Sequence, residues 1–377
     1  MQRLKRDPRS NWQAEVENLG FGFHSGDISY WDESACYTFT ESEINEIEKA
    51  TAEVYRLCLA AVEHIITNKR YEQFQIPAGC ISLIEKSWNN DEPSIYGRFD
   101  FSINNGQIKL LEFNADTPTG LFEAGIVQWF WLQDVDKQQD QFNSIHEKLI
   151  AYWKYLVPYL NEGVLHFTCL KDSLEDLTTT EYLRDCAIQA GIKTKLIFID
   201  EIGWDETQMK LIDVEEAPIT NIFKLYPWEW LATDEFFNHI TEDLNCFWIE
   251  PAWKMLLSNK AILPILYELF PESPYILPAL FNDEGNMKSY VKKPLLSREG
   301  ANIQLVKHYG TIEKSEGMYG KEGFVFQQLF ELPDFDGQHP VVGSWVIGGE
   351  PAGIGIREST QLITDNTSRF IPHYITA

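Results

Sequence analysis

Four polar side chains alternate with apolar ones along two neighbouring segments of the chain. Arg98 and Asp100 have even residue numbers in the segment YGRFDFSIN (96–104), and Glu112 and Asn114 have even residue numbers in the segment QIKLLEFN (107–114). Most of the odd positions are apolar, as in strands that bury one face. An Asn-Asn-Gly sequence separates the segments and predicts a turn. Residues 94–114 are therefore expected to form a β-hairpin.

The loop of this hairpin decides whether the four groups meet. With an odd number of loop residues, as in three-residue loops with glycine, the even positions of both strands point to the same side. Ile108 and Leu110 interrupt that polar face, so we expect other structure to cover its turn-proximal end. The converging oxygens would suit a hard cation such as Mg²⁺, and the guanidinium would suit a phosphoryl group. The alternative is a surface hairpin with a ladder of salt bridges, because cross-strand charge pairs are common.

Two further segments could contact a ligand. Thr117 and Thr119 lie in the loop A-D-T-P-T-G, where hydroxyls suit ligand contact and also plain helix capping. Lys260 stands in a break between two apolar helical stretches, and a strand-like segment ends in V-K-K-P before S-R-E-G-A-N-I. A glycine-containing turn after a lysine-bearing strand can offer backbone amides to phosphates. Neither a P-loop nor a dinucleotide-binding glycine motif is present in the sequence.

Composition narrows the class of protein. The 377 residues include 31 Lys and Arg against 57 Asp and Glu, a formal net charge of −26, which argues against bulk nucleic acid binding. Without a signal-peptide pattern or a long apolar run, we expect a cytoplasmic protein with no membrane segment. Six scattered cysteines with no C-x-x-C pair predict reduced core thiols, and a catalytic cysteine is the alternative.

Hydrophobic periodicity predicts an α/β region followed by an α+β region. A capping box at Thr40 and Glu43 opens a helix over 41–68, and a β-α-β unit covers 164–200. Other helices are expected over 120–132, 142–160 and, with a break, 252–271. Strands are expected after 221 and at 287–295, 324–330, 341–349 and 351–360, the last four in a mixed or antiparallel sheet. We expect three approximate lobes, 1–160 with the hairpin, 161–250 and 251–377, that share an interface.

The ordered motifs resemble those of a known family. The block Y-G-R-F-D-F…L-L-E-F-N-A-D-T-P-T-G, with K-L-Y-P-W-E-W, S-N-K-A-I-L-P, V-K-K-P…R-E-G-A-N-I and G-I-R-E-S-T, resembles the synthetase domain of the glutathionylspermidine synthase family across nearly the whole chain. It looks most like the stand-alone bacterial members described as acid-amine ligases. The resemblance implies an ATP-grasp fold with a pre-ATP-grasp-like N-terminal lobe. Bifunctional members also carry an amidase, for which 377 residues leave no room.

The activity implied by the resemblance is amide formation between a peptide carboxylate and a polyamine, through an acyl phosphate, with ATP and Mg²⁺. It makes Asp100, Glu112 and Asn114 the magnesium ligands and Arg98 the catalytic group that holds the transferred phosphoryl. The ATP contacts that it implies are Arg98, Phe99, Asp100, Lys260, Lys293, Gly300 in a mobile covering loop, Gln327 on the adenine side, and Leu362, Ile363 and Thr364. Lys292 and Gln328 are alternative registers for two of them.

Substrate residues follow less directly from the resemblance. Thr117 and Thr119 replace the serine-bearing loop that receives the acid, and Glu175 and Asp176 match an acidic amine-binding pair. Arg357 matches an arginine that grips a substrate carboxylate. The alternatives are a solvated helix start for the acidic pair and a structural salt bridge for Arg357. The expected partners are a small-molecule acid and amine, with the oligomeric state left open.

Two other functions remain open at this stage. One is a nucleotide-binding protein with ATPase activity that acts through a partner without ligase turnover. The other is a metal-dependent phosphohydrolase, which needs metal-bridging histidines or an activated water, whereas the eight histidines are scattered along the chain.

Overall fold

The longest helix begins where the capping signal predicts. In the computed structural model, which describes residues 1–26, 29–243, 245–282 and 285–376, α2 (Glu41–Thr67) opens with both bonds of the Thr40–Glu43 capping box. Its apolar face is buried in a core shared with the two largest sheets, and α2 contacts β16 (His339–Ile347) and β17 (Glu350–Ser359). This helix therefore supports the back of the sheet that carries the predicted hairpin.

The predicted hairpin is the edge of a five-stranded antiparallel sheet. It consists of β3 (Tyr96–Asn104) and β4 (Gln107–Asn114), and the sheet order is β18-β17-β16-β3-β4, with β18 at Arg369–Ile371. The sheet thus joins strands of the expected first and third lobes, which means that these lobes are not separate layers. The three-lobe division otherwise stays a prediction.

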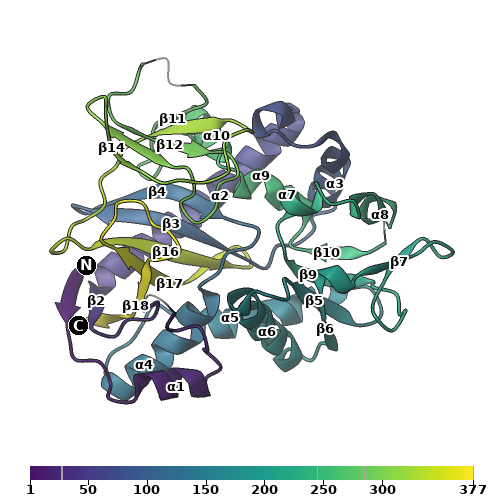
Figure 1. Ribbon diagram of the computed structural model, residues 1–377, viewed down its shortest axis with the longest axis horizontal. Coiled ribbons are helices and arrows are strands. Elements are labelled where there is room, and N and C mark those ends of the chain that lie inside the picture. The colour runs from purple at the N-terminus through teal and green to yellow at the C-terminus, as the bar shows by residue number, and fades with distance from the viewer. Residues whose placement is uncertain (27–28, 244, 283–284, 377) are drawn as a thin grey trace.

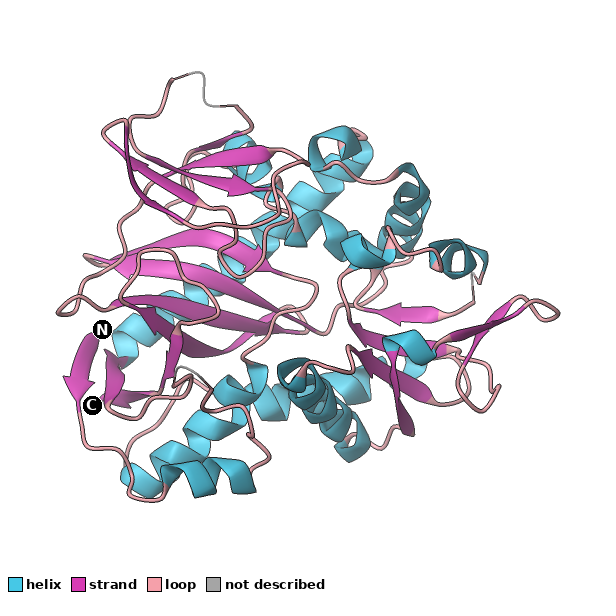
Figure 2. Ribbon diagram, viewed as in Figure 1, coloured by secondary structure: helices cyan, strands magenta, loops and turns pink. Residues whose placement is uncertain are grey.

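A second five-stranded antiparallel sheet lies above the first (Figures 1 and 2). Its order is β11-β15-β12-β13-β14, with bounds Ala279–Leu280, Phe324–Gln328, Tyr290–Pro294, Gln304–Lys307 and Gly310–Lys314. The strands expected at 287–295 and 324–330 belong here, and those expected at 341–349 and 351–360 belong to the first sheet. The predicted helix, break and helix are α9 (Met255–Ser258) and α10 (Ile262–Leu269), with α10 packed on β11 and β15.

The β-α-β prediction is confirmed by a parallel sheet that stands apart in Figure 2. Strands β5 (Leu165–Cys169) and β6 (Thr194–Phe198) pair in parallel around α6 (Leu174–Gln189), and the sheet order is β10-β9-β5-β6. Its other strands are β9 (Asn221–Leu225) and β10 (Phe247–Ile249), and a hairpin of β7 (Gly203–Asp205) and β8 (Lys210–Ile212) lies beside it.

The remaining elements cover the sheets. Both ends of the chain meet in a small sheet of β1 (Gln2–Lys5), β2 (Ala35–Thr40) and β19 (His373–Thr376). The other helices are α1 (Trp12–Asn18), α3 (Ala78–Asn89), α4 (Gln128–Val135), α5 (Ile145–Leu156), α7 (Trp228–Leu231) and α8 (Phe237–Glu242). Among the described residues, no helix combines the length and apolarity needed to cross a membrane.

Candidate active site

A β-bulge brings the four polar residues of the hairpin to one face. The connecting turn has two residues, Asn105 and Gly106, both with positive φ, rather than the expected odd number. The pairing changes between Asp100 opposite Glu112 and the next pair along, so Leu111 is the extra residue. One extra residue shifts the alternation by one position, which restores the shared face that the two-residue turn alone would have prevented.

The bulge also corrects the expectation for Ile108 and Leu110. Both lie in the core with the ring of Phe113, on the face opposite the polar residues, so they do not interrupt the polar face. The interpretation as a surface hairpin is wrong, because β3 is paired on both sides and Asp100 is only 2% exposed.

Asp100 joins two guanidinium groups. Its Oδ1 accepts a hydrogen bond from Nε of Arg98 at 2.8 Å, and its Oδ2 accepts one from Arg357 at 2.6 Å. Arg98 lies over Gly343 of β16, where a Cβ would come within 2.8 Å of its side chain. Arg357 thus forms the structural salt bridge that was one of its two interpretations, while it also lines the cavity described below.

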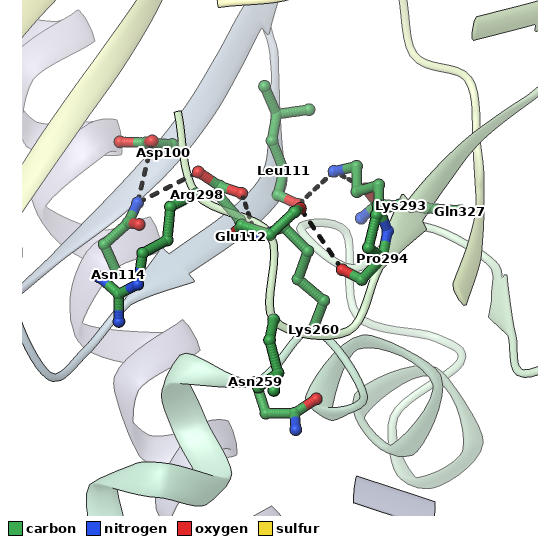
Figure 3. A network of polar contacts seen from close by, with 12 residues as sticks. Asp100, Leu111, Glu112, Asn114, Asn259, Lys260, Lys293, Pro294, Arg298 and Gln327 are labelled. Carbon is green, nitrogen blue, oxygen red and sulfur yellow. Dashed lines mark hydrogen bonds and ion pairs between the residues drawn. The ribbon is translucent and has the colours of Figure 1, made fainter. Parts of the chain in front are cut away.

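The predicted magnesium ligands converge at the open end of this hairpin. The amide nitrogen of Asn114 donates to Asp100 at 3.1 Å and to Glu112 at 3.2 Å (Figure 3). Rotating the side-chain amide of Asn114 by 180° would place its oxygen, instead of its nitrogen, beside the two carboxylates. One amide oxygen and one oxygen from each carboxylate, completed by water, are ligands that suit Mg²⁺. The set contains only two carboxylates. Among the described residues no cluster of three or more His, Cys, Asp or Glu side chains could hold a metal.

Two lysines approach the hairpin from the second sheet and from the helix break. Nζ of Lys260 lies 3.1 Å from Oε2 of Glu112, and Nζ of Lys293 donates to the carbonyl of the bulged Leu111 at 2.8 Å (Figure 3). Burial lowers the pKa of Lys293 to about 8. Burial alone would raise the pKa of Glu112, but the charges of Lys260 and Lys293 outweigh it and hold this pKa well below its usual range.

The alternative glutamines, Gln327 and Gln328, lie in different surroundings, and so do the alternative lysines, Lys293 and Lys292. The carboxamide of Gln327 accepts a hydrogen bond from Lys293 at 2.8 Å and donates one to the carbonyl of Leu110 at 2.9 Å. It therefore holds the lysine side chain in position. Gln328 is exposed, and Nζ of Lys292 lies over the ring of Phe324. Of these four side chains, only Lys293 lines the cavity between the sheets.

A cavity of about 980 Å³ lies between the two five-stranded sheets and extends to the N-terminus of α6. Fifteen of the predicted site residues line it: Arg98, Asp100, Glu112, Asn114, Thr117, Thr119, Glu175, Asp176, Lys260, Lys293, Gly300, Arg357, Leu362, Ile363 and Thr364. Gln327 does not line it. Phe99 does not either, because its ring is buried in the core and stacks on Phe113 with centroids 3.9 Å apart.

Gly300 occupies a position that excludes any side chain. It has φ +69°, and a Cβ there would lie 2.6 Å from the carbonyl oxygen of Thr364. The segments around Gly300 and Thr364 therefore close over one side of the cavity at backbone contact distance. Glu313 of β14 accepts hydrogen bonds from the backbone amides of Leu362 and Ile363, which ties the second segment to the upper sheet.

The far end of the cavity carries the predicted substrate residues. Glu175 and Asp176 stand in the first turn of α6, which Ser173 caps, and both line the cavity, while their role in binding an amine stays a prediction. Burial raises the pKa of Glu175, and burial with the charge of Glu175 raises the pKa of Asp176 to about 6. Thr117 accepts from Nη1 of Arg298 at 2.8 Å instead of capping a helix.

Sequence reasoning did not single out several cavity residues. Arg298, in the S-R-E-G sequence before the Gly300 segment, forms an ion pair with Glu229 of α7 and donates a hydrogen bond to Thr117. It therefore joins the Gly300 segment to the loop that contains Thr117 and Thr119. Tyr30 also lines the cavity, and its hydroxyl donates to a buried glutamate, Glu123. Tyr30 lies in no segment with hydrophobic periodicity and in none of the family motifs, so no sequence signal indicated it.

The cysteine alternative finds no support in the structure. All six cysteines are buried and free. Sγ of Cys186 lies 3.7 Å from Nδ1 of His146, but burial raises the pKa of this thiol to about 12, so it stays protonated at neutral pH.

Comparison with known proteins supports the family resemblance that the sequence motifs indicate. A family model described as glutathionylspermidine synthase preATP-grasp matches residues 3–376. A Haemophilus influenzae protein named "Putative acid--amine ligase" is 41% identical over an alignment of 391 residues that covers 99% of each chain. The Escherichia coli bifunctional glutathionylspermidine synthetase/amidase is 29% identical over 399 residues, which cover 98% of this chain and 62% of that protein. A solved glutathione synthetase-like effector from Globodera pallida has a TM-score of 0.58 at 11% identity, covering 99% of this chain and 98% of that chain, a likeness of fold alone. The chain belongs to the glutathionylspermidine synthase family.

Proposed function

We propose that the protein is an ATP-dependent ligase that joins a carboxylic acid to an amine through an acyl phosphate. The observation that carries this proposal is one continuous cavity that joins a cationic, oxygen-rich end to an acidic end. Lys260 and Lys293 stand with Glu112 at the first end, and Glu175 and Asp176 line the cavity where α6 begins. A nucleotide and two further substrates need such a chemically divided space.

The arrangement of sheets supports an ATP-grasp architecture. The nucleotide would lie between the two antiparallel sheets, with Lys260 and Lys293 against its phosphates and the Gly300 segment over them. Asp100, Glu112 and Asn114 would hold Mg²⁺, which supplies charge neutralisation for phosphoryl transfer. Gln327 would act on the nucleotide only through Lys293, which it positions.

The residues of this chain then divide the work of the reaction. A carboxylate is a poor acceptor for an amine because oxide is a bad leaving group, so phosphorylation must come first. Arg98, held by Asp100 and by the carbonyl of Thr119, is oriented before the reaction and needs no reorganisation to stabilise the developing charge. Thr117, Thr119 and Arg357 would orient the acid, and Glu175 and Asp176 would attract the ammonium of the amine.

We further propose a peptide-like acid and a polyamine-like amine. The relatives named as glutathionylspermidine synthetases and the acidic end of the cavity both support this substrate class. A cationic amine would neutralise Glu175 and Asp176, whose pKa values are raised by burial and, for Asp176, also by the charge of Glu175.

Coupling distinguishes this function from its alternative. ADP release would be measured with ATP and Mg²⁺ alone, with a candidate acid, and with acid plus amine, beginning with glutathione and spermidine. Hydroxylamine, which is small and unprotonated at neutral pH, should trap the acyl phosphate as a hydroxamate when the correct acid is present. Steady ATP hydrolysis without hydroxamate from any acid of a peptide panel would favour a nucleotide-binding protein without ligase turnover.

A further inference from the structure

Tyr30 and Glu123 form a buried pair behind the acidic end of the cavity. Tyr30 lines the cavity, and its hydroxyl donates to Oε1 of Glu123 at 2.7 Å. Glu123 is fully buried, and its Oε2 has no hydrogen-bond partner among the described residues. It opens a π-helical turn (Glu123–Val127) that follows Gly120, and such turns often occur at functional sites. Tyr30 therefore connects this carboxylate to the cavity.

Amide formation from an ammonium requires a group that takes up a proton. Alkyl ammonium groups have a pKa of about 10.4 by analogy with lysine, so the amine arrives protonated at neutral pH. Glu175 and Asp176 would hold that charge, and a carboxylate that stabilises an ammonium makes its deprotonation harder. The proton therefore needs a second acceptor beside the acidic pair.

We propose that Tyr30 and Glu123 are a proton relay that accepts a proton from the amine during its attack on the activated acid, an inference that rests on the proposed ligase function. The hydroxyl oxygen of Tyr30 takes a proton from the nitrogen while its own proton passes to Oε1 of Glu123. The tyrosine ends neutral and the carboxyl ends protonated. The freed electron pair of nitrogen forms the C–N bond, and the acyl carbon–oxygen bond to phosphate breaks. The second proton lost by nitrogen leaves with the phosphate as hydrogen phosphate.

The surroundings of Glu123 suit a proton acceptor. Burial, with the charge of Glu175 on α6, raises its pKa to about 7, against the opposing charge of Arg98 on β3. Burial also raises the pKa of Tyr30 well above its usual value, although Arg357 on β17 opposes this. The tyrosine therefore passes a proton on without storing negative charge. A group with a pKa near the working pH is the most effective general base.

The test compares two nucleophiles on the same activated acid. Wild type, Tyr30→Phe and Glu123→Gln would be given ATP, Mg²⁺ and glutathione with either spermidine or hydroxylamine. Hydroxylamine needs no initial deprotonation, so hydroxamate formation should stay at the wild-type rate in both variants. Amide formation with spermidine should fall by about 100-fold or more, the usual contribution of general base catalysis.

A pH profile separates proton transfer from a structural role. In wild type, kcat/KM for spermidine should rise to a plateau above a pH of about 7, where Glu123 is ionised. In Glu123→Gln this inflection should vanish, and the rate should keep rising toward the pKa of the amine, about 10.4. Glu175→Gln should instead raise KM for spermidine and keep an inflection.

Four results would overturn the relay. Unchanged amide formation in Tyr30→Phe, or an equal loss with both nucleophiles, would remove it while leaving the ligase function in place. The same holds if the inflection moves with Glu175→Gln and not with Glu123→Gln. No hydroxamate from the wild-type protein with any acid of the peptide panel would overturn the proposed function, and the relay with it.

Discussion

Nζ of Lys293 lies 2.8 Å from the carbonyl oxygen of Leu111, the extra residue of the β-bulge. The same irregularity that aligns Asp100 with Glu112 therefore also supplies an acceptor for a lysine of the other sheet. The two sheets are thus joined beside the proposed phosphate contacts. The bulge places the proposed magnesium ligands of β3 and β4 next to Lys293.

Lys293→Met should weaken ATP binding by about tenfold or more, because it removes a buried charge while keeping the chain length. Lys292→Met, at the neighbouring position with its ammonium over Phe324, is the matched control and should bind normally. Calorimetric titration with ATP and Mg²⁺ measures both. If Lys292→Met is the weaker binder, the register is wrong.

ATP affinity should also depend on pH through Lys293. Its pKa of about 8 means that the ammonium is charged below pH 8 and mostly neutral above pH 9. Affinity should therefore fall as pH rises through this window, and binding at pH 8.5 should take up protons. Titrations in buffers of different ionisation enthalpy detect that uptake, and Lys293→Met should abolish it. A wild-type affinity that stays constant from pH 7 to 9.5 would contradict this role.

Asp100→Ala and Glu112→Ala should both remove Mg²⁺-dependent activity, but their effects on stability should differ. Asp100 is buried between Arg98 and Arg357, so its loss leaves two guanidinium groups without their partner and should cost about 3 kcal/mol. The side chain of Glu112 is 26% exposed, and its removal should cost less. Urea unfolding compares the two, and wild-type turnover in either variant would remove the metal assignment.

Arg98→Lys should depress turnover more than ATP affinity. Lysine keeps the charge but loses the fork that binds Asp100 and the Thr119 carbonyl, so the charge is no longer held in place. We expect a loss of about 100-fold in kcat, in the range found when one stabilising donor is removed. A pure loss of ATP affinity with unchanged kcat would assign Arg98 to binding alone.

Gly300→Ala should reduce activity with little effect on the fold. A Cβ at this position would lie 2.6 Å from the carbonyl oxygen of Thr364, so the covering segment must shift. Gly310→Ala, on the neighbouring hairpin, meets its nearest atom at 3.5 Å and serves as the control. Comparing KM for ATP in the two variants tests the closure, and equal values would show that the Gly300 contact does not matter.

Local sequence patterns were sufficient to identify the hairpin, the capped α2 helix and the β-α-β unit. Turn chemistry, periodicity and capping act over a few residues, so they can be recognised without knowledge of the fold. Family motifs supplied most of the site, because residues that touch one ligand recur in a fixed order along the chain.

Other features depended on contacts between segments far apart in the sequence. The sequence predicted the shared face of Asp100 and Glu112 for the wrong reason, since a bulge and not the loop length produces it. Bulges are favoured by what the extra residue can bind. Here Lys293 of β12 and Gln327 of β15 bind the carbonyls of Leu111 and Leu110, which lie 182 and 217 residues earlier in the chain, respectively.

Tertiary structure alone placed Arg357 on Asp100 and Tyr30 on Glu123. Each of these outcomes depends on which side chain fills the space opposite, and that choice is made only when the sheets and helices pack. The sequence therefore determined the chemistry that is available to this protein, and packing decided which groups meet to carry it out.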